Sequence, residues 1–194
     1  ILYFLTHEEE MLRLDVRKLR IRWEYLLGII KIGLPAGLQS MVFSLSNVVI
    51  QAAINSFGSD GIAGSTAEQN FEFMAYFVIN AFAQTATTFT SQNFAAQDKE
   101  RCKKIYRLCT FIGLASCLGL SLIFLIGRHL FIQIFSTDEN VIHYAMIRMW
   151  SVCLLELLTG VYEISGGCLR GMGHSMTPAV ITVLGTCVFR LVWV

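Results

Sequence analysis

The feature that most constrains this chain is a series of apolar stretches, each long enough to cross a membrane. A spanning helix needs about 20 mostly apolar residues, and such stretches occupy residues 34–57, 70–92, 108–127, 144–167 and 177–194. The chain is 55% hydrophobic and only 15% charged, whereas soluble domains carry roughly 25% charged residues. The sequence therefore predicts an all-α fold, a polytopic transmembrane helical bundle with about five spanning helices.

The two ends of the chain have the composition of membrane helices. Residues 1–5 are apolar and precede an acidic run at residues 8–10, so we expect the end of a preceding transmembrane helix and not a signal peptide. We expect residues 6–33 to form a cytoplasmic loop. Residues 34–194 then form a transmembrane lobe, which we expect to be incomplete.

The distribution of Lys and Arg predicts the orientation of the helices. The connection 6–33 holds six of these residues, the connection 93–107 holds five and the connection 168–176 holds Arg170. The alternate connections hold none at 58–69 and only Arg128 at 128–143. Because Lys and Arg in short loops favour the cytoplasmic side, we expect the connections 6–33, 93–107 and 168–176 to be cytoplasmic.

The first connection has the pattern of an amphipathic helix. Its apolar residues recur at steps of three and four with basic residues between them: Leu12, Val16, Leu19, Trp23, Leu26 and Ile30. This pattern favours a helix at the inner membrane interface. A plain cytoplasmic connector is the alternative.

Three of the predicted spans carry a stripe of polar residues on one helical face. The stripes are Ser40, Ser44, Asn47, Gln51 and Asn55; Glu72, Tyr76, Asn80, Gln84, Thr87 and Ser91; and Glu156, Thr159 and Glu163. Because polar groups are costly in lipid, we expect the stripes to face an interior cavity. The span at 108–127 carries no charge or amide, and we expect it to face lipid.

The stripes supply the candidate site residues. An ionisable group at membrane depth is usually functional, whereas Ser, Thr, Asn and Gln also serve as ordinary hydrogen-bonding groups between helices. The candidates for cation or substrate binding are Glu72, Glu156, Glu163, Asn47, Gln51, Tyr76, Asn80 and Thr159.

Three other charged residues receive separate predictions. Glu68 lies near the predicted outer edge, where we expect it to be solvated, and Arg148 lies where it can snorkel without a functional role. Arg190 is deep in the last span and is expected to form a structural ion pair, with a substrate contact as the alternative.

Enzymatic and metal-binding motifs are not found in the sequence. The four His residues lie in different connections, and no GxSxG or HExxH motif occurs. We predict no catalytic residue, no cofactor, and no metal apart from a coupling Na⁺.

Three motifs in order resemble the MATE (multidrug and toxic compound extrusion) transporters. They are Lys31–Gly37 opening a helix, Ser91–Asn93 followed by Ala95-Ala96, and Gly167–Gly173 followed by Pro178. The resemblance covers residues 30–194 and is to the C-terminal half of the family. It implies one lobe of a two-lobe transporter, whose partner would be the N-terminal lobe of the same chain.

The resemblance also implies a function and a location. Members of the family exchange drugs, organic cations or metabolites for Na⁺ or H⁺ by alternating access, here across a plasma membrane such as the bacterial inner membrane. Glu72 is similar in place to an acidic position early in the family's eighth helix. Thr159 occupies the approximate position of the tenth-helix acid, and Glu163 lies one turn away.

Two alternatives remain open from the sequence. A lipid-linked precursor flippase of a related superfamily would need several cations in its cavity to hold a pyrophosphate, and Arg190 is the only deep cation predicted. A non-transporting membrane protein, such as a receptor or an assembly subunit, is the other alternative.

Overall fold

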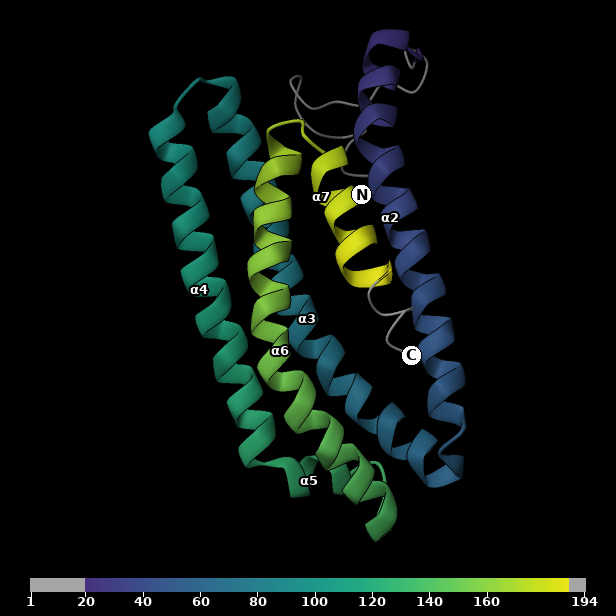
Figure 1. Cartoon of the computed structure of the whole chain (residues 1–194). Coiled ribbons are helices and arrows are strands. Elements are labelled where there is room, and N and C mark those ends of the chain that lie inside the picture. The colour runs from purple at the N-terminus through teal and green to yellow at the C-terminus, as the bar shows by residue number, and fades with distance from the viewer. Residues whose placement is uncertain (1–19, 189–194) are drawn as a thin grey trace. The chain divides into compact units, whose positions relative to one another are not determined.

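The computed structural model describes residues 20–188, which fold as helices without any strand among them (Figure 1). This confirms the predicted all-α class. The elements are α2 (Trp23–Asn55), α3 (Gly58–Ala95), α4 (Lys99–Ile126), α5 (Arg128–Gln133), α6 (Glu139–Gly171), α7 (Met176–Thr182) and the π-helical η2 (Val183–Val188). The chain divides into two compact units, Ile1–Lys31 and Ile32–Val194, and the helix packing below belongs to the second.

Two of the described helices, α2 and α4, are long and apolar enough to cross a membrane. The helix α6 adds a third span if its parts Glu139–Val152 and Leu155–Gly171, bent by 46° to each other, cross together. The helix α3 has 38 residues but is more polar, with acidic residues at Asp60, Glu68 and Glu72. The total of five spans therefore stays a prediction.

The helices extend beyond the predicted apolar windows. The structure places residues 58–69 inside α3 and starts α4 at Lys99, so most of the predicted connections 58–69 and 93–107 are helical. Between α3 and α4 only a short turn remains, in which Gln97 has φ 60° and Asp98 accepts a hydrogen bond from the Arg101 backbone N–H at 3.0 Å. An apolar window detects only the lipid-compatible middle of a helix, which explains the difference.

The first predicted connection also ends earlier than expected, because α2 begins at Trp23 and runs through Pro35. Trp23, Leu26 and Ile30 are therefore continuous with the first predicted span. The predicted helix stump at 1–5, and Leu12, Val16 and Leu19, lie outside the described residues. Interfacial placement stays a prediction.

The core lies where α3, α4 and α6 pack side by side (Figure 1). Its largest cluster contains Phe71, Phe124, Ile132 and Met149. One face of α4 is buried, through Cys109, Gly113, Cys117, Ser121 and Phe124. The prediction that this span faces lipid is therefore wrong for that face, where small residues spaced by four permit close packing.

Glycines bring the backbones of α3 and α6 into contact at both ends of their interface. A Cβ at Gly64 would lie 2.6 Å from the Val141 carbonyl oxygen, and one at Gly167 would lie 2.5 Å from the Ala83 carbonyl oxygen. These separations leave no room for a methyl group. The two helices therefore form the most closely packed pair of this bundle.

Replacing Gly167 with Ala should push α3 and α6 apart and destabilise the protein by about 1–3 kcal/mol, the usual cost of overpacking. Gly119→Ala is the matched control, since a Cβ there meets nothing within 4 Å and Ala favours a helix. Thermal denaturation of the intact protein in detergent measures both. Equal melting temperatures for the two variants would contradict this account of the interface.

Candidate functional site

The first polar cluster joins α3 and α6 through a half-buried arginine. Arg148 Nε lies 2.6 Å from Glu68 Oε2, Arg148 Nη2 donates to Glu72 Oε2 at 2.8 Å, and Arg148 Nη1 donates to the Ser65 hydroxyl. Ser65, Glu68 and Glu72 are three and four residues apart, so they share one face of α3. The guanidinium thus spreads its donors over two turns of the neighbouring helix.

This cluster corrects two predictions. Glu68 is 1% exposed and not solvated, and Arg148 pairs with carboxylates and does not snorkel without a partner. The position of a residue along its own helix does not show which residues of a neighbouring helix lie opposite it. The pairing arises because α6 places Arg148 opposite the acidic face of α3.

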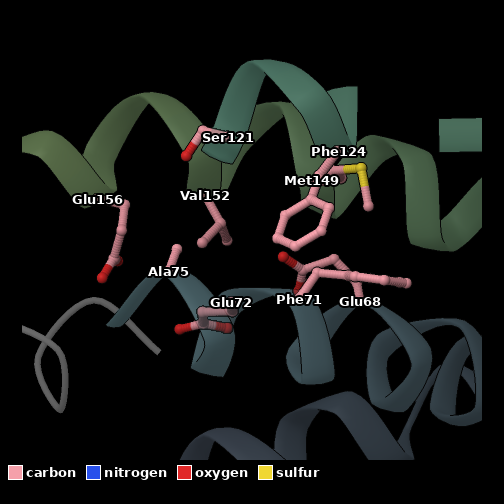
Figure 2. A pocket seen from close by; sticks show the side chains of 9 residues that line it. All are labelled: Glu68, Phe71, Glu72, Ala75, Ser121, Phe124, Met149, Val152 and Glu156. Carbon is pink, nitrogen blue, oxygen red and sulfur yellow. The ribbon is translucent and has the colours of Figure 1, made fainter. Parts of the chain in front are cut away.

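A small cavity of about 10 Å³, the glutamate cavity, adjoins this cluster between α3, α4 and α6 (Figure 2). Glu68 and Glu72 line it from α3, Glu156 from α6 and Ser121 from α4. Glu156 is 7% exposed and Ser121 is 5% exposed. Glu68 Oε2, Glu156 Oε1 and Ser121 Oγ find no hydrogen-bond partner among the described residues, but Glu68 Oε2 has the ion pair with Arg148. Glu156 Oε1 and Ser121 Oγ therefore are the atoms of this set without an ion pair or a hydrogen bond among the described residues.

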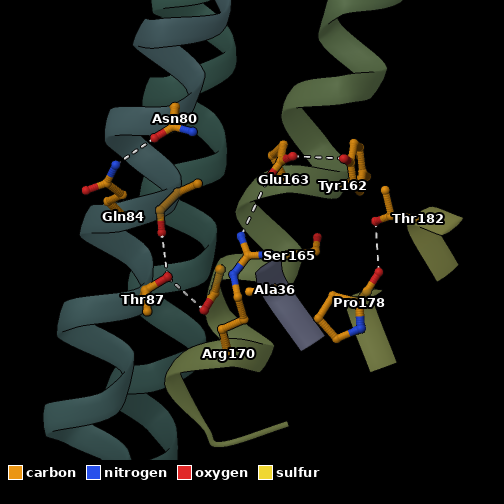
Figure 3. A network of polar contacts seen from close by, with 12 residues as sticks. Ala36, Asn80, Gln84, Thr87, Tyr162, Glu163, Ser165, Arg170, Pro178 and Thr182 are labelled. Carbon is orange, nitrogen blue, oxygen red and sulfur yellow. Dashed lines mark hydrogen bonds and ion pairs between the residues drawn. The ribbon is translucent and has the colours of Figure 1, made fainter. Parts of the chain in front are cut away.

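A second polar cluster lies further along α6 (Figure 3). Tyr162 donates to Glu163 Oε1 at 2.8 Å, and Arg170 Nη2 donates to Glu163 Oε2 at 3.4 Å. On α3, Thr87 Oγ1 donates to the Gly167 carbonyl oxygen at 3.0 Å. This cluster therefore sits where the glycines of α6 meet α3.

A row of amides follows the exposed side of α3 beside the second cluster. Gln84 Nε2 donates to Asn80 Oδ1 at 2.7 Å, and Asn80 Nδ2 donates to the Tyr76 hydroxyl at 3.4 Å. Tyr76 and Asn80 are half-buried, whereas Gln84 is exposed. The part of the predicted α3 stripe from Tyr76 to Gln84 is thus a chain of side-chain hydrogen bonds.

Three more predicted site residues lie on described helices, Asn47 and Gln51 on α2 and Thr159 on α6. On α2, Gln51 Nε2 donates to Asn55 Oδ1 at 3.2 Å and Asn47 is exposed. Thr159 is half-buried on α6 between Glu156 and Glu163. Arg190 lies outside the described residues, so its ion pair stays a prediction.

Sequence reasoning missed several members of the two clusters. The sequence predicted no binding role for five of them: Glu68, Ser121, Arg148, Tyr162 and Arg170. The spacing of Ser65, Glu68 and Glu72 was a signal for the first cluster, because it places the three residues on one helical face. Within residues 20–188 no group of three His, Cys, Asp or Glu side chains has the geometry of a metal site.

Long apolar helices, together with glutamates that are buried between the helices and paired with half-buried arginines, define this chain as a multi-pass helical membrane protein. The model of the MatE family matches residues 35–193. The chain therefore belongs to the MatE family, and the resemblance found in its motifs is confirmed.

Curated relatives agree with this assignment. The chain is 20% identical over 191 residues to a probable multidrug resistance protein NorM of Thermotoga maritima, covering 98% of this chain and 41% of the relative. It is 22% identical to the probable multidrug resistance protein YoeA of Bacillus subtilis, covering 86% and 36%. It is 23% identical to the multidrug export protein MepA of Staphylococcus aureus, covering 95% and 40%. The chain thus spans about two-fifths of the length of these relatives.

The Arg148 cluster predicts a specific pattern of stability. Arg148→Gln leaves the buried Glu68 without its counter-charge and should cost roughly 3–5 kcal/mol. Adding Glu68→Gln should recover part of that loss, because it removes the unpaired charge. Thermal denaturation of the intact protein tests both variants.

The control is Lys103→Gln, which breaks the Lys103–Glu100 pair on the surface, where the side chains are 64% and 83% exposed. Such pairs contribute about 0–1 kcal/mol. If Glu68→Gln worsens the Arg148→Gln variant, charge neutralisation is not the role of Arg148.

Proposed function

We propose that this protein exports small amphipathic molecules, many of them cationic, in exchange for Na⁺ or H⁺. Membership of the MatE family and the similarity to multidrug resistance and export proteins support this function. The proposed setting is a plasma membrane, such as the bacterial inner membrane, with the segments 6–33, 93–107 and 168–176 on the cytoplasmic side. Alternating access of two lobes, of which residues 34–194 supply part of one, is the proposed mechanism.

The observation that carries the proposal is the cavity between α3, α4 and α6. Three carboxylates line it, those of Glu68, Glu72 and Glu156, and the one guanidinium beside them, that of Arg148, pairs with Glu68 and Glu72. When all three are ionised the cluster carries an excess of negative charge in an apolar bundle, which is costly without a further cation. We assign the coupling cation to this cavity.

The two atoms without partners suggest where that cation binds. Glu156 Oε1 and Ser121 Oγ are buried oxygens at the cavity, and hard cations prefer carboxylate and hydroxyl oxygens. A proton on Glu156 satisfies the same carboxylate. Arg148 acts as a positioning residue here, because it holds Glu68 and Glu72 on the opposite wall.

Transport follows if the cation and the substrate favour different states of the protein. A ligand shifts a conformational equilibrium only through its different affinities for the two states. In the proposed cycle the cation neutralises Glu156 in one state, and a substrate held by Glu163, Asn80 and Tyr76 favours the other. The remaining candidates, Asn47, Gln51 and Thr159, are proposed to line the substrate path.

The flippase alternative finds less support in these contacts. A pyrophosphate needs cations that are free to bind it, whereas Arg148 is held by two carboxylates and Arg170 by one. We therefore retain cation-coupled export.

Glu156→Gln should abolish coupling, because an amide neither carries a negative charge nor takes up a proton. Efflux of a cationic dye by the intact protein in proteoliposomes should then fall to its level without a Na⁺ or H⁺ gradient. Glu100→Gln is the matched control on the exposed surface of α4 and should transport normally. Gradient-driven efflux that persists in Glu156→Gln would refute the assignment.

A further inference from the structure

Two thiols from different helices meet at one residue of α3. The Cys102 thiol donates to the Thr90 carbonyl oxygen at 3.8 Å, and the Thr90 hydroxyl donates to Cys168 Sγ at 3.5 Å. Cys102 lies in the first turn of α4, and Cys168 lies in the last turn of α6. Both are free thiols, so both sulfurs are available for chemistry.

The packing of α4 against α6 places these two cysteines at the same level. The hydroxyls of Tyr106 and Ser165 share a hydrogen bond of 3.2 Å, and a Cβ at Gly160 would lie 2.9 Å from the Leu114 side chain. The contacts move forward along α4 as they move back along α6, so the two helices are antiparallel. One turn from the first contact, toward the start of α4, this register brings the two cysteines opposite each other.

A third thiol, Cys109, packs in the same region and provides an internal comparison. Cys109 and Cys168 belong to one buried cluster. In the register of the helices, however, Cys109 is level with a residue one turn before Ser165, whereas Cys168 lies one turn after it. Cys102 is half-buried, whereas Cys109 and Cys168 are only 8% and 6% exposed. Cys102 is therefore the thiol of the three that a dissolved reagent reaches most easily.

The bonds that hold the two sulfurs at Thr90 are easily given up. A thiol is a weak donor, and its sulfur is a weak acceptor. Thr90 is 1% exposed, but a helical threonine hydroxyl can bond to the carbonyl oxygen four residues earlier in its own helix. Thr90 thus stays satisfied when the sulfurs leave it.

We propose that Cys102 and Cys168 form a peroxide-reactive thiol pair that closes to a disulfide between α4 and α6. The Cys102 sulfur attacks the O–O bond of the peroxide, so an S–O bond forms and the other oxygen leaves as an alcohol or as water. The Cys168 thiol then attacks the resulting sulfenic acid, so an S–S bond forms and water leaves. Two electrons pass from the two thiols to the peroxide, and a dithiol reductant reverses the reaction.

The place of the pair suits a reversible, regulatory disulfide. The proposed orientation puts the segments 93–107 and 168–176 on the cytoplasmic side, where disulfides are usually transient and often redox-sensing. The disulfide ties to α4 the part of α6 that lies beyond the 46° bend, Leu155–Gly171. It therefore restricts changes in that bend, and oxidation should inhibit transport. Only this inhibition rests on the proposed export function, whereas formation of the disulfide does not.

The test maps the disulfides of the intact protein in detergent after treatment with hydrogen peroxide. Peptides from a non-reducing digest are identified by mass spectrometry. The unmodified protein should yield two peptides linked through Cys102 and Cys168, and dithiothreitol should separate them. Thiols that stay unchanged, or a link between two protein molecules, would overturn the proposal.

Three alanine variants identify the pair. Cys102→Ala and Cys168→Ala should each lose the linked peptides, whereas the matched control Cys109→Ala should keep them. A link from Cys109 to Cys168 in the unmodified protein would contradict the assigned register. The melting temperatures of the untreated variants check folding. If the buried Cys168→Ala variant does not fold, Cys102→Ala decides the question at a half-buried position.

A transport measurement separates this proposal from the proposed function. Gradient-driven efflux of a cationic dye by the cross-linked protein should fall and then recover with dithiothreitol, whereas Cys102→Ala should keep its efflux after the same peroxide treatment. Undiminished efflux by the cross-linked protein would refute the inhibition. Absence of efflux from the untreated protein would count against export, and the linked peptides would still support the thiol pair.

Discussion

An arginine inside an apolar helical bundle needs partners for its charge and its donors, and the partners of Arg148 among the described residues lie on one face of α3. Its bonds to Glu68, Glu72 and Ser65 fix how far along α3 the first part of α6 sits. Glycines at Gly64 and Gly167 then allow the two backbones to touch at both ends. The shape of the glutamate cavity follows from this pairing.

The same pairing divides the acidic residues into two groups. Glu68 and Glu72 are held by Arg148, whereas Glu156, about two turns further along α6, has an oxygen without a partner among the described residues. The bend of 46° in α6 falls between Arg148 and Glu156. The proposed coupling cation would therefore bind to the part of α6 that the arginine does not anchor, which offers a route from cation binding to a change in the bend.

The sequence predicted those features that depend on composition and helical periodicity. The all-α class, the MatE membership, and the burial of Glu156 and Glu163 follow from apolar length, from three motifs and from a stripe at helical spacing. The residues that bond to these glutamates depend on which helices are neighbours, and a single sequence does not specify the neighbours of a helix. The sequence predicts how far along its helix Arg148 lies, and this distance placed it near the end of the span. The sequence does not predict that Arg148 lies opposite the acidic face of α3.

The prediction that the span at 108–127 faces lipid was wrong for one face of α4, for a related reason. Apolar composition indicates that a helix tolerates lipid, and it does not indicate which face packs against protein. Cys109, Gly113, Cys117 and Ser121 form a narrow buried face, and Ser121 thereby reaches the glutamate cavity. A stripe of small residues at a spacing of four was the available signal.

The central claim is that a cation in the glutamate cavity and a substrate favour different states of the protein. The most direct measurement is the release of Na⁺ or H⁺ when a cationic dye is added to the purified intact protein, recorded with ion-selective electrodes. We expect release by the unmodified protein and none by Glu156→Gln. Equal release by the two proteins, or dye binding without any cation release, would contradict it.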